Sequence, residues 1–279
     1  MMDTIQYNMI AEITELVDVI SLQKLIWGND TVTPVPQLVA AIKNGGMITG
    51  SFFNGELIGF TYGFAGFKNH ENYLVSHMTA VHPNYQNLGI GLKLKLKQRD
   101  WAINYGYKKI IWTYDPLESR NAFFNLNKLG AYVRNCEPSY YGEMNDKLNI
   151  GMPTDRFLVE WDISSERVIK TLAGNFIISE EALKYPLLLN WERKDNIPYP
   201  IVVENNSLIE KGYLLPIPKN IQHLKQSDLK LAISWRLAIR NAAIAAFSNG
   251  FTLTGILKMN QNMIQYYVFE KNILEEFND

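Results

Sequence analysis

Six residues between a predicted strand and a predicted helix have the types and spacing that could bind a phosphate. The segment reads Gln86-Asn87-Leu88-Gly89-Ile90-Gly91. Its two glycines place no side chain where the helix begins, so the first N–H groups of the helix are accessible and carry the positive end of its dipole. An anion, most naturally a phosphate, binds at such a helix start.

Two other phosphate-binding motifs do not fit this segment. The dinucleotide motif requires Gly-x-Gly-x-x-Gly, and Leu94 stands where its third glycine would be. The triphosphate loop requires Gly-Lys followed by Ser or Thr, which is absent. The spacing that fits is Gln-x-x-Gly-x-Gly, after a strand that ends in Val-x-Pro. The alternative interpretation is a glycine turn that opens an ordinary helix.

The elements around this segment follow from periodicity and turn residues. Residues 75–81 alternate as a strand, with His77 and Thr79 expected on one face. Asn54-Gly55 favours the primed turn of a hairpin between two apolar runs. The expected helices and strands are, in order, helices 14–27 and 37–43, strands 47–53, 57–65 and 75–81, helix 92–105, strand 109–114, a helix from 119, and strands from 132 and over 157–163.

These motifs and this order of elements resemble the GNAT (N-acetyltransferase) superfamily, whose pyrophosphate-binding signature is Arg/Gln-x-x-Gly-x-Gly/Ala. A second signature of the superfamily is matched in part by Ala122, Lys128 and Gly130. Leu126 stands where that signature has a tyrosine, which is the usual general acid toward the leaving thiolate. The whole chain is similar to an uncharacterised two-part GNAT-like acyltransferase group.

The resemblance implies an α+β fold with a GNAT-like mixed, mostly antiparallel sheet flanked by helices. We expect an acyl-CoA-binding domain over residues 1–163. Residues 164–279 would form a smaller α+β C-terminal part, which shapes the acceptor pocket or an interface. Within that part, residues 227–247 are typical of a long amphipathic helix. Residues 190–200 are polar and proline-bearing, which indicates a linker or surface loop.

The same resemblance implies that acetyl-CoA or another acyl-CoA is the co-substrate. Its pantetheine arm is expected along the edge of the strand at Thr79, Ala80 and Val81, with polar contacts from Asn121 and Asn125. Its diphosphate is expected on the turn that consists of Gln86, Asn87, Leu88, Gly89, Ile90, Gly91 and Leu92.

Five further side chains are candidates for catalysis or acceptor binding. His77 is the predicted general base, because imidazole titrates near pH ~6.5; the alternative is a hydrogen-bonded strand histidine. Tyr140 and Tyr141 are the candidate acids, and packing is their alternative role. Arg236 and Arg240 are four residues apart on one helix face and could clamp an acceptor carboxylate, unless they are solvent-exposed.

Composition limits the remaining classes. The 279 residues are 47% hydrophobic and 20% charged, with a formal net charge of −1, which argues against a general nucleic-acid or membrane-surface binder. The one cysteine allows no intramolecular disulfide, which is consistent with a cytoplasmic protein. The four histidines show no metal-ligand spacing, so no metal is expected.

The sequence therefore predicts a cytoplasmic acyl-CoA-dependent N-acyltransferase. A small amine or amino-acid-like acceptor would attack the thioester directly in a ternary complex, with acetyl as the default acyl group. The expected partners are this small-molecule amine and, as one option, a second copy of the chain. The alternatives are a non-catalytic acyl-CoA-binding sensor or scaffold, which the missing tyrosine favours, and a protein lysine acetyltransferase.

Overall fold

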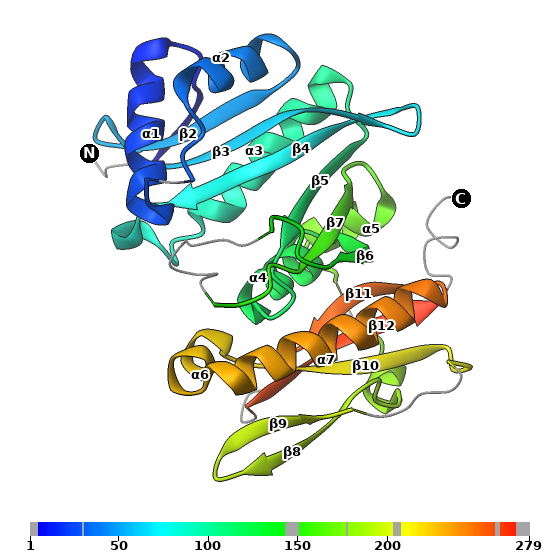
Figure 1. Ribbon diagram of the computed structural model, residues 1–279. Helices are drawn as coiled ribbons and strands as arrows, with labels where there is room; N and C mark the ends of the chain where they lie inside the picture. Colours follow the sequence, from blue (N-terminus) through cyan, green and yellow to red (C-terminus); the bar gives the residue numbers. More distant parts are fainter. Residues whose placement is uncertain are drawn as a thin grey trace. The chain divides into compact units, whose positions relative to one another are not determined.

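The computed structural model describes residues 5–29, 31–142, 151–176, 178–202, 208–259 and 263–271 (Figure 1). The chain divides into two compact units, Met1–Trp112 and Thr113–Asp279. This division falls within a strand, whereas the sequence placed a domain boundary after Ile163. That boundary stays a prediction.

The first unit is built on a mixed, mostly antiparallel sheet, as predicted. Strands β1, β2, β3 and β4 pair antiparallel in that order, and β5 pairs parallel with β4. The first strand was not foreseen. The elements are β1 (Gln6–Met9), α1 (Ile13–Trp27), α2 (Val35–Lys43), β2 (Met47–Phe53), β3 (Glu56–Lys68), β4 (Glu71–Val81), η1 (Pro83–Tyr85), α3 (Ile90–Tyr105) and β5 (Lys109–Tyr114).

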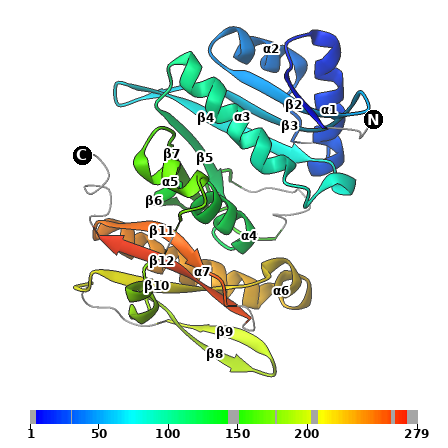
Figure 2. The ribbon, with the colours of Figure 1, turned by 180° about the vertical axis from the view of Figure 1, so that it is seen from behind.

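The helices of this unit cover both faces of the sheet. Helices α1 and α2 lie on one face of β2–β4 and α3 lies on the other (Figures 1 and 2). Phe60 and Tyr62 are buried under α1 and α2 together with Leu16 and Leu38. Leu94 of α3 packs on the opposite face. Alternate residues of each strand thus face different helices, as strand geometry requires.

The turn between β2 and β3 is the primed turn that the sequence predicted. Asn54 and Gly55 have φ values of 51° and 83°, and Phe53 pairs with Glu56 across the turn. A primed two-residue turn needs positive φ at both positions, which Asn and Gly adopt at the lowest cost. This turn sets the register of the hairpin.

Strands β4 and β5 pair only briefly. Leu74 lies opposite Ile110 and Val75 opposite Ile111, and the described pairs between the two strands end there. On its other edge β4 stays paired with β3 as far as Val81. The β5-facing edge of β4 beyond Val75 is therefore available to another extended chain.

A β-bulge in β4 corrects one expectation from the sequence. The register shifts where Tyr62 pairs with Met78 but Gly63 pairs with Ser76, which leaves His77 as the extra residue. His77 consequently lies against the Tyr62 and Phe64 rings on the α1–α2 face. Thr79 instead bonds to Thr61, so the expected shared face of His77 and Thr79 is wrong. A bulge breaks the two-residue alternation on which that expectation rested.

A buried lysine joins α3 to the point where β4 and β5 part. Lys95 is 3% exposed, and its Nζ donates to Ser76 Oγ at 2.9 Å and to Gln98 Oε1 at 2.7 Å. The same ammonium group lies 4.0 Å from the centre of the Trp112 ring. Ser76 and Trp112 directly follow the last paired residues of the two strands. Burial lowers the pKa of Lys95 to about 7.

The second unit contains a further antiparallel arrangement of strands. Strand β7 pairs with β6, β6 with β11, β11 with β12, and β12 with β10. Its elements are α4 (Ser119–Ala122), η2 (Phe123–Lys128), β6 (Tyr132–Glu137), β7 (Arg156–Asp162), α5 (Glu166–Leu172), η3 (Glu180–Lys184), β8 (Asn190–Lys194), β9 (Ile197–Ile201), β10 (Gly212–Pro218), α6 (Ile221–Ser227), α7 (Leu229–Ser248), β11 (Phe251–Leu257) and β12 (Ile264–Lys271).

Residues 190–200 form a hairpin and not the predicted loop. Strands β8 and β9 pair from Asn190 opposite Ile201 to Lys194 opposite Ile197. The turn uses positive φ at Asp195 and Asn196, 48° and 62°. The prolines that suggested a loop lie in a two-stranded sheet, where each strand has an edge without a partner and so tolerates the missing N–H.

Helix α7 is the predicted long helix of this unit and lies along β10–β12 (Figure 1). Asp228 caps it by accepting a hydrogen bond from the Leu231 N–H. Trp235 is fully buried, and its Nε1 donates to the Pro198 carbonyl at 2.9 Å. That bond joins α7 to the β8–β9 hairpin.

The buried lysine gives a prediction for stability against pH. Between pH 7 and 10 the unfolded chain keeps the Lys95 proton while the folded chain has lost it, because the pKa falls from 10.5 to about 7 on folding. Fewer bound protons in the folded state mean that stability rises with pH. We expect the stability of wild type relative to Lys95→Met to rise by about 1 kcal/mol per pH unit between pH 7 and 9.

Urea unfolding of both proteins at four pH values measures this difference. Lys97→Met is the matched control, because Lys97 is an exposed lysine on the same helix. Parallel pH profiles for wild type and Lys95→Met would contradict the prediction.

Candidate functional site

The predicted phosphate-binding turn joins η1 to the start of α3. Gly89 is the N-cap of α3 with φ 77° in the left-handed region, and Asn87 also has a positive φ of 67°. The first bond of the helix runs from the Lys93 N–H to the Gly89 carbonyl. The N-cap glycine has no side chain with which to cap this helix start. The N–H groups of Ile90, Gly91 and Leu92 therefore precede the helical ladder and can donate to an anion.

The surroundings of the two glycines fit a phosphate group. Among the described residues, no atom lies within 4 Å of the position that a Cβ on Gly89 would take. A Cβ on Gly91 would meet only Val81, at 4.0 Å. A side chain at either position would not collide with the protein itself. The two glycines therefore leave open space beside the helix N-terminus. Leu88 is 64% exposed at the same place.

The predicted cofactor-binding residues of β4 lie directly before this turn. Thr79 and Val81 are half-buried and Ala80 is buried. The Gln86 side chain donates to the Val81 carbonyl at 3.5 Å and so joins the turn to the strand end. Along the chain, the bulge at His77 therefore comes first, then the strand edge at the end of β4, and then the turn.

The predicted base His77 lies between aromatic rings at the bulge. Its ring centre is 5.9 Å from that of Tyr62 and 5.7 Å from that of Phe64. The residue is exposed, yet these neighbours desolvate the imidazole enough to lower its pKa. His77 is accordingly neutral at pH 7 and can accept a proton. By contrast, His82 Nδ1 accepts the Asn84 N–H and stabilises the turn.

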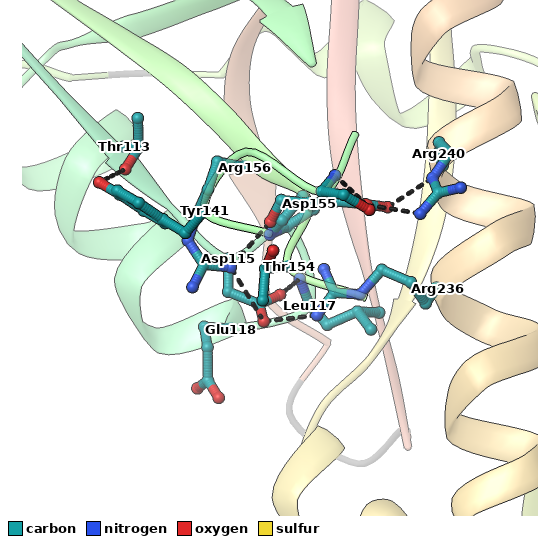
Figure 3. A network of polar contacts seen from close by, with 12 residues as sticks. Thr113, Asp115, Leu117, Glu118, Tyr141, Thr154, Asp155, Arg156, Arg236 and Arg240 are labelled. Carbon is teal, nitrogen blue, oxygen red and sulfur yellow. Dashed lines mark hydrogen bonds and ion pairs between the residues drawn. The ribbon is translucent and has the colours of Figure 1, made fainter. Parts of the chain in front are cut away.

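The two candidate acids lie in the second unit. Tyr140 and Tyr141 are exposed by 47% and 46%, and their rings meet edge to face. The Tyr141 hydroxyl is 3.1 Å from Thr113 Oγ1, and the Arg156 guanidinium lies 5.4 Å from its ring (Figure 3). Both phenols are accessible to solvent, and their role as acids stays a prediction.

Helix α4 continues into a π-helical turn, η2, which buries part of the second signature. Leu126 is fully buried, so its side chain belongs to the core. Asn125 is 4% exposed in the same turn, whereas Asn121 is exposed on α4. Of the two predicted polar contacts for the pantetheine arm, Asn121 alone presents its side chain to solvent.

Arg236 and Arg240 belong to a polar network at one side of α7 (Figure 3). Arg240 donates from Nε and Nη2 to the two oxygens of Asp155, at 2.7 and 2.6 Å. Asp155 is 1% exposed and also accepts the Ser139 N–H. Arg236 donates from Nη2 to Asp115 at 2.5 Å. Both arginines thus bind carboxylates of the protein, and their contact with a substrate stays a prediction.

A half-buried glutamate lies beside this network. Glu118 accepts a hydrogen bond from Gln222 at 2.6 Å. Burial raises its pKa; Gln222 opposes the shift, and the charge of nearby Asp115 adds to it while that of Arg236 opposes it. Cys136 is buried, and desolvation raises the pKa of its thiol to about 12, so it is a poor nucleophile.

Sequence reasoning missed several of these groups. Lys95 lies between two exposed lysines, Lys93 and Lys97, and only its spacing from Leu94, Gln98 and Ala102 on the buried stripe could have identified it. Asp115 and Glu118 follow the end of β5, where polar side chains often form sites. Their position after the end of a strand could have identified Asp115 and Glu118 as candidate site residues.

The described part of the chain offers neither a metal-binding cluster nor a membrane span. No group of three metal-ligating side chains is present in it. Its helices are all too short or too polar to cross a bilayer.

Comparison with known proteins finds a family model that matches the first unit and the beginning of the second. A family model described as the acetyltransferase (GNAT) family matches residues 17–130. This range contains α1 from Val17 onward, α2, α3, the turn at Gly89 and all of η2. No curated protein matches the chain.

Solved structures with a similar fold cover a little over half of the chain. The ribosomal-protein-S18-alanine N-acetyltransferase from Escherichia coli is 16% identical, with a TM-score of 0.45, over 58% of this chain and 95% of that chain. An acetyltransferase of the GNAT family from Streptococcus pneumoniae is 14% identical, with a TM-score of 0.46, over 56% and 98%.

An aminoglycoside acetyltransferase from an uncultured soil metagenomic sample, in complex with sisomicin, is 14% identical, with a TM-score of 0.38, over 42% of this chain and 82% of that chain. Likeness at this level carries no argument about the acceptor. The likeness to the family rests on the sequence match. Residues 17–130 of this chain match the model of the acetyltransferase (GNAT) family.

Proposed function

We propose that this protein is an acyl-CoA-dependent N-acyltransferase that acts on a small amine by direct attack in a ternary complex. The observation that carries the proposal is the open helix start at Gly89, within a segment that matches the acetyltransferase family. Acetyl-CoA is the expected donor, and it would supply the activated thioester.

The binding of the donor would use backbone groups of the first unit. The N–H groups from Leu88 to Leu92 would hold the diphosphate at the positive end of the α3 dipole. The unpaired edge of β4 at Thr79, Ala80 and Val81 would hydrogen-bond the amide groups of the pantetheine arm. Because the arm would run from the turn toward the point where β4 and β5 part, its reactive end would approach the bulge at His77.

The chemistry requires that the acceptor amine lose a proton and that the departing thiolate gain one. His77 would take the ammonium proton, directly or through one water, because its lowered pKa keeps it neutral at pH 7. A β4 backbone N–H would donate to the thioester oxygen as negative charge develops there. Tyr140 or Tyr141 would return a proton to sulfur, or the solvent would do so.

Substitution of Gly89 tests the binding of the donor. Gly89→Val should weaken CoA binding at least 100-fold, because its side chain would fill the open space beside the helix N–H groups. Calorimetric titration with acetyl-CoA and succinyl-CoA measures the effect and identifies the preferred acyl group.

Gly55→Val is the matched control, since Gly55 also has a positive φ, 83°, and open surroundings, but lies in the β2–β3 turn. Both valines pay the same backbone strain. Equal CoA affinity in the two variants, or no binding by wild type, would refute the donor site.

Substitution of His77 tests the general base. His77→Gln should lower kcat/KM by about 100-fold at pH 7. In the wild type, kcat/KM should decline on the acid side with an apparent pKa below 6.5, because desolvation lowers the pKa of His77. This acid limb should be absent from the variant. His223→Gln, at an exposed position of α6, is the control and should keep the wild-type profile. An unchanged acid limb in His77→Gln would show that His77 is structural.

One observation favours a second candidate function, a non-catalytic acyl-CoA-binding sensor or scaffold. Leu126 is fully buried at the position where the family signature has the tyrosine that acts as general acid. Release of free thiol from acetyl-CoA across a broad panel of amines separates the two functions. Tight CoA binding without any thiol release would favour the sensor.

A further inference from the structure

The guanidinium group of Arg236 is less completely bonded than that of its neighbour on α7. Arg240 donates from two nitrogens to both oxygens of Asp155. Arg236 donates from Nη2 alone, and to a single oxygen of Asp115. Its Nε and Nη1 are buried and have no hydrogen-bond partner among the described residues. The residue is 2% exposed.

Such buried donors are rarely left without an acceptor. An unsatisfied buried N–H costs about 1–3 kcal/mol, and more when the group is charged. Native structures satisfy most of these groups with protein atoms, water or a ligand. Its partner Asp115 already accepts the Leu117 N–H at 2.8 Å through its second oxygen and lies 3.9 Å from Arg156 Nη1. A water molecule or a bound ligand can therefore supply the acceptor at Nε or Nη1.

A carboxylate is the ligand group that suits this position best. Guanidinium binds carboxylate through charge-assisted hydrogen bonds, which are roughly twice as strong as neutral ones. In a desolvated site the attraction between opposite charges adds to that strength. Water could accept the same hydrogens but would leave the positive charge without this gain.

The groups around Arg236 also favour a positive charge on the same ligand. Asp115 and Glu118 are half-buried and lie in the same group of polar residues as the buried arginine (Figure 3). Their mutual repulsion contributes to the raised pKa of Glu118. A nearby ammonium group would relieve that repulsion. A ligand that binds Arg236 beside these two carboxylates is most favoured when it carries both an amine and a carboxylate.

We propose that Arg236, with Glu118 and Asp115, binds an amino-acid-like ligand whose carboxylate meets Arg236 and whose amine meets Glu118. As an identification of the acceptor class, this inference rests on the proposed acyltransferase function. As a binding site, it can be tested without any acyl-CoA. Arg240 is not part of the proposed site, because its Nε and Nη2 already donate to the two oxygens of Asp155.

Thermal unfolding of the full-length protein with matched ligand pairs tests the site. The pairs are glycine and glycinamide, L-serine and L-serinamide, and L-lysine and L-lysinamide, with acetate as the carboxylate that lacks an amine. At least one acid should raise Tm by about 5 °C at 100 times its Kd, and its amide should raise Tm by much less. The proposal is overturned if no acid exceeds its own amide.

Substitutions assign the response to these residues. Arg236→Lys keeps the charge opposite Asp115 but removes Nε and Nη1, and it should weaken binding of the amino acid at least tenfold. Arg134→Lys is the matched control, because Arg134 binds Glu160 through Nε and Nη2 elsewhere in the unit. Glu118→Gln lies in a half-buried position and should weaken amino-acid binding without changing the response to acetate.

The remaining outcomes separate this inference from the proposed function. Equal binding by wild type and Arg236→Lys would overturn the site, as would a crystal structure of the ligand-soaked protein with only water on Nε and Nη1. If Arg236→Lys does not fold, Glu118→Gln and that crystal structure decide. Amino-acid binding in a protein that fails to bind CoA would refute the acyltransferase and leave the site intact.

Discussion

The early end of pairing between β4 and β5 is the constraint on which the candidate donor site depends. Buried backbone N–H and C=O groups need partners, and β4 finds them along its full length with β3 but only at Leu74 and Val75 with β5. The edge beyond Val75 therefore presents donors and acceptors in strand geometry. An extended, amide-bearing ligand can pair with that edge. Under the proposed function, the helix start at Gly89 would add an anion site at its far end, so one strand would order both halves of a phosphorylated ligand.

The parting of these strands is supported from both faces of the sheet. On the α3 face, Lys95 reaches Ser76 and Trp112, one on each strand, at the positions where pairing stops. On the other face, the bulge turns His77 toward Tyr62 and Phe64. Each group is desolvated, and desolvation favours the neutral form of a base. The same burial that fixes the strand geometry therefore lowers the pKa of Lys95 to about 7 and that of His77 below its ordinary value.

In the second unit, charge is buried in pairs. Asp155 is held by Arg240 and by a backbone N–H, so its burial is compensated. Asp115 is shared between Arg236 and the start of α4. A buried ion pair adds little net stability because desolvation cancels much of its attraction. Such pairs do fix geometry, and here they position an incompletely bonded guanidinium next to a glutamate with a raised pKa.

The sequence by itself determined the likeness of residues 17–130 to the acetyltransferase family, the mixed sheet and the glycine turn at the start of α3. These depend on local signals: Gly89 and Gly91 at a helix start, Asn54-Gly55 in a primed turn, and two-residue alternation along strands. It failed where partners distant in sequence decide. The face of His77 depends on the register of β4 against β3, and the burial of Lys95 on the packing of α3 over the strand fork. The pairing of Arg240 with Asp155 joins residues 85 positions apart. Only tertiary structure brings these groups together, because a contact between distant residues leaves no periodic trace in the chain.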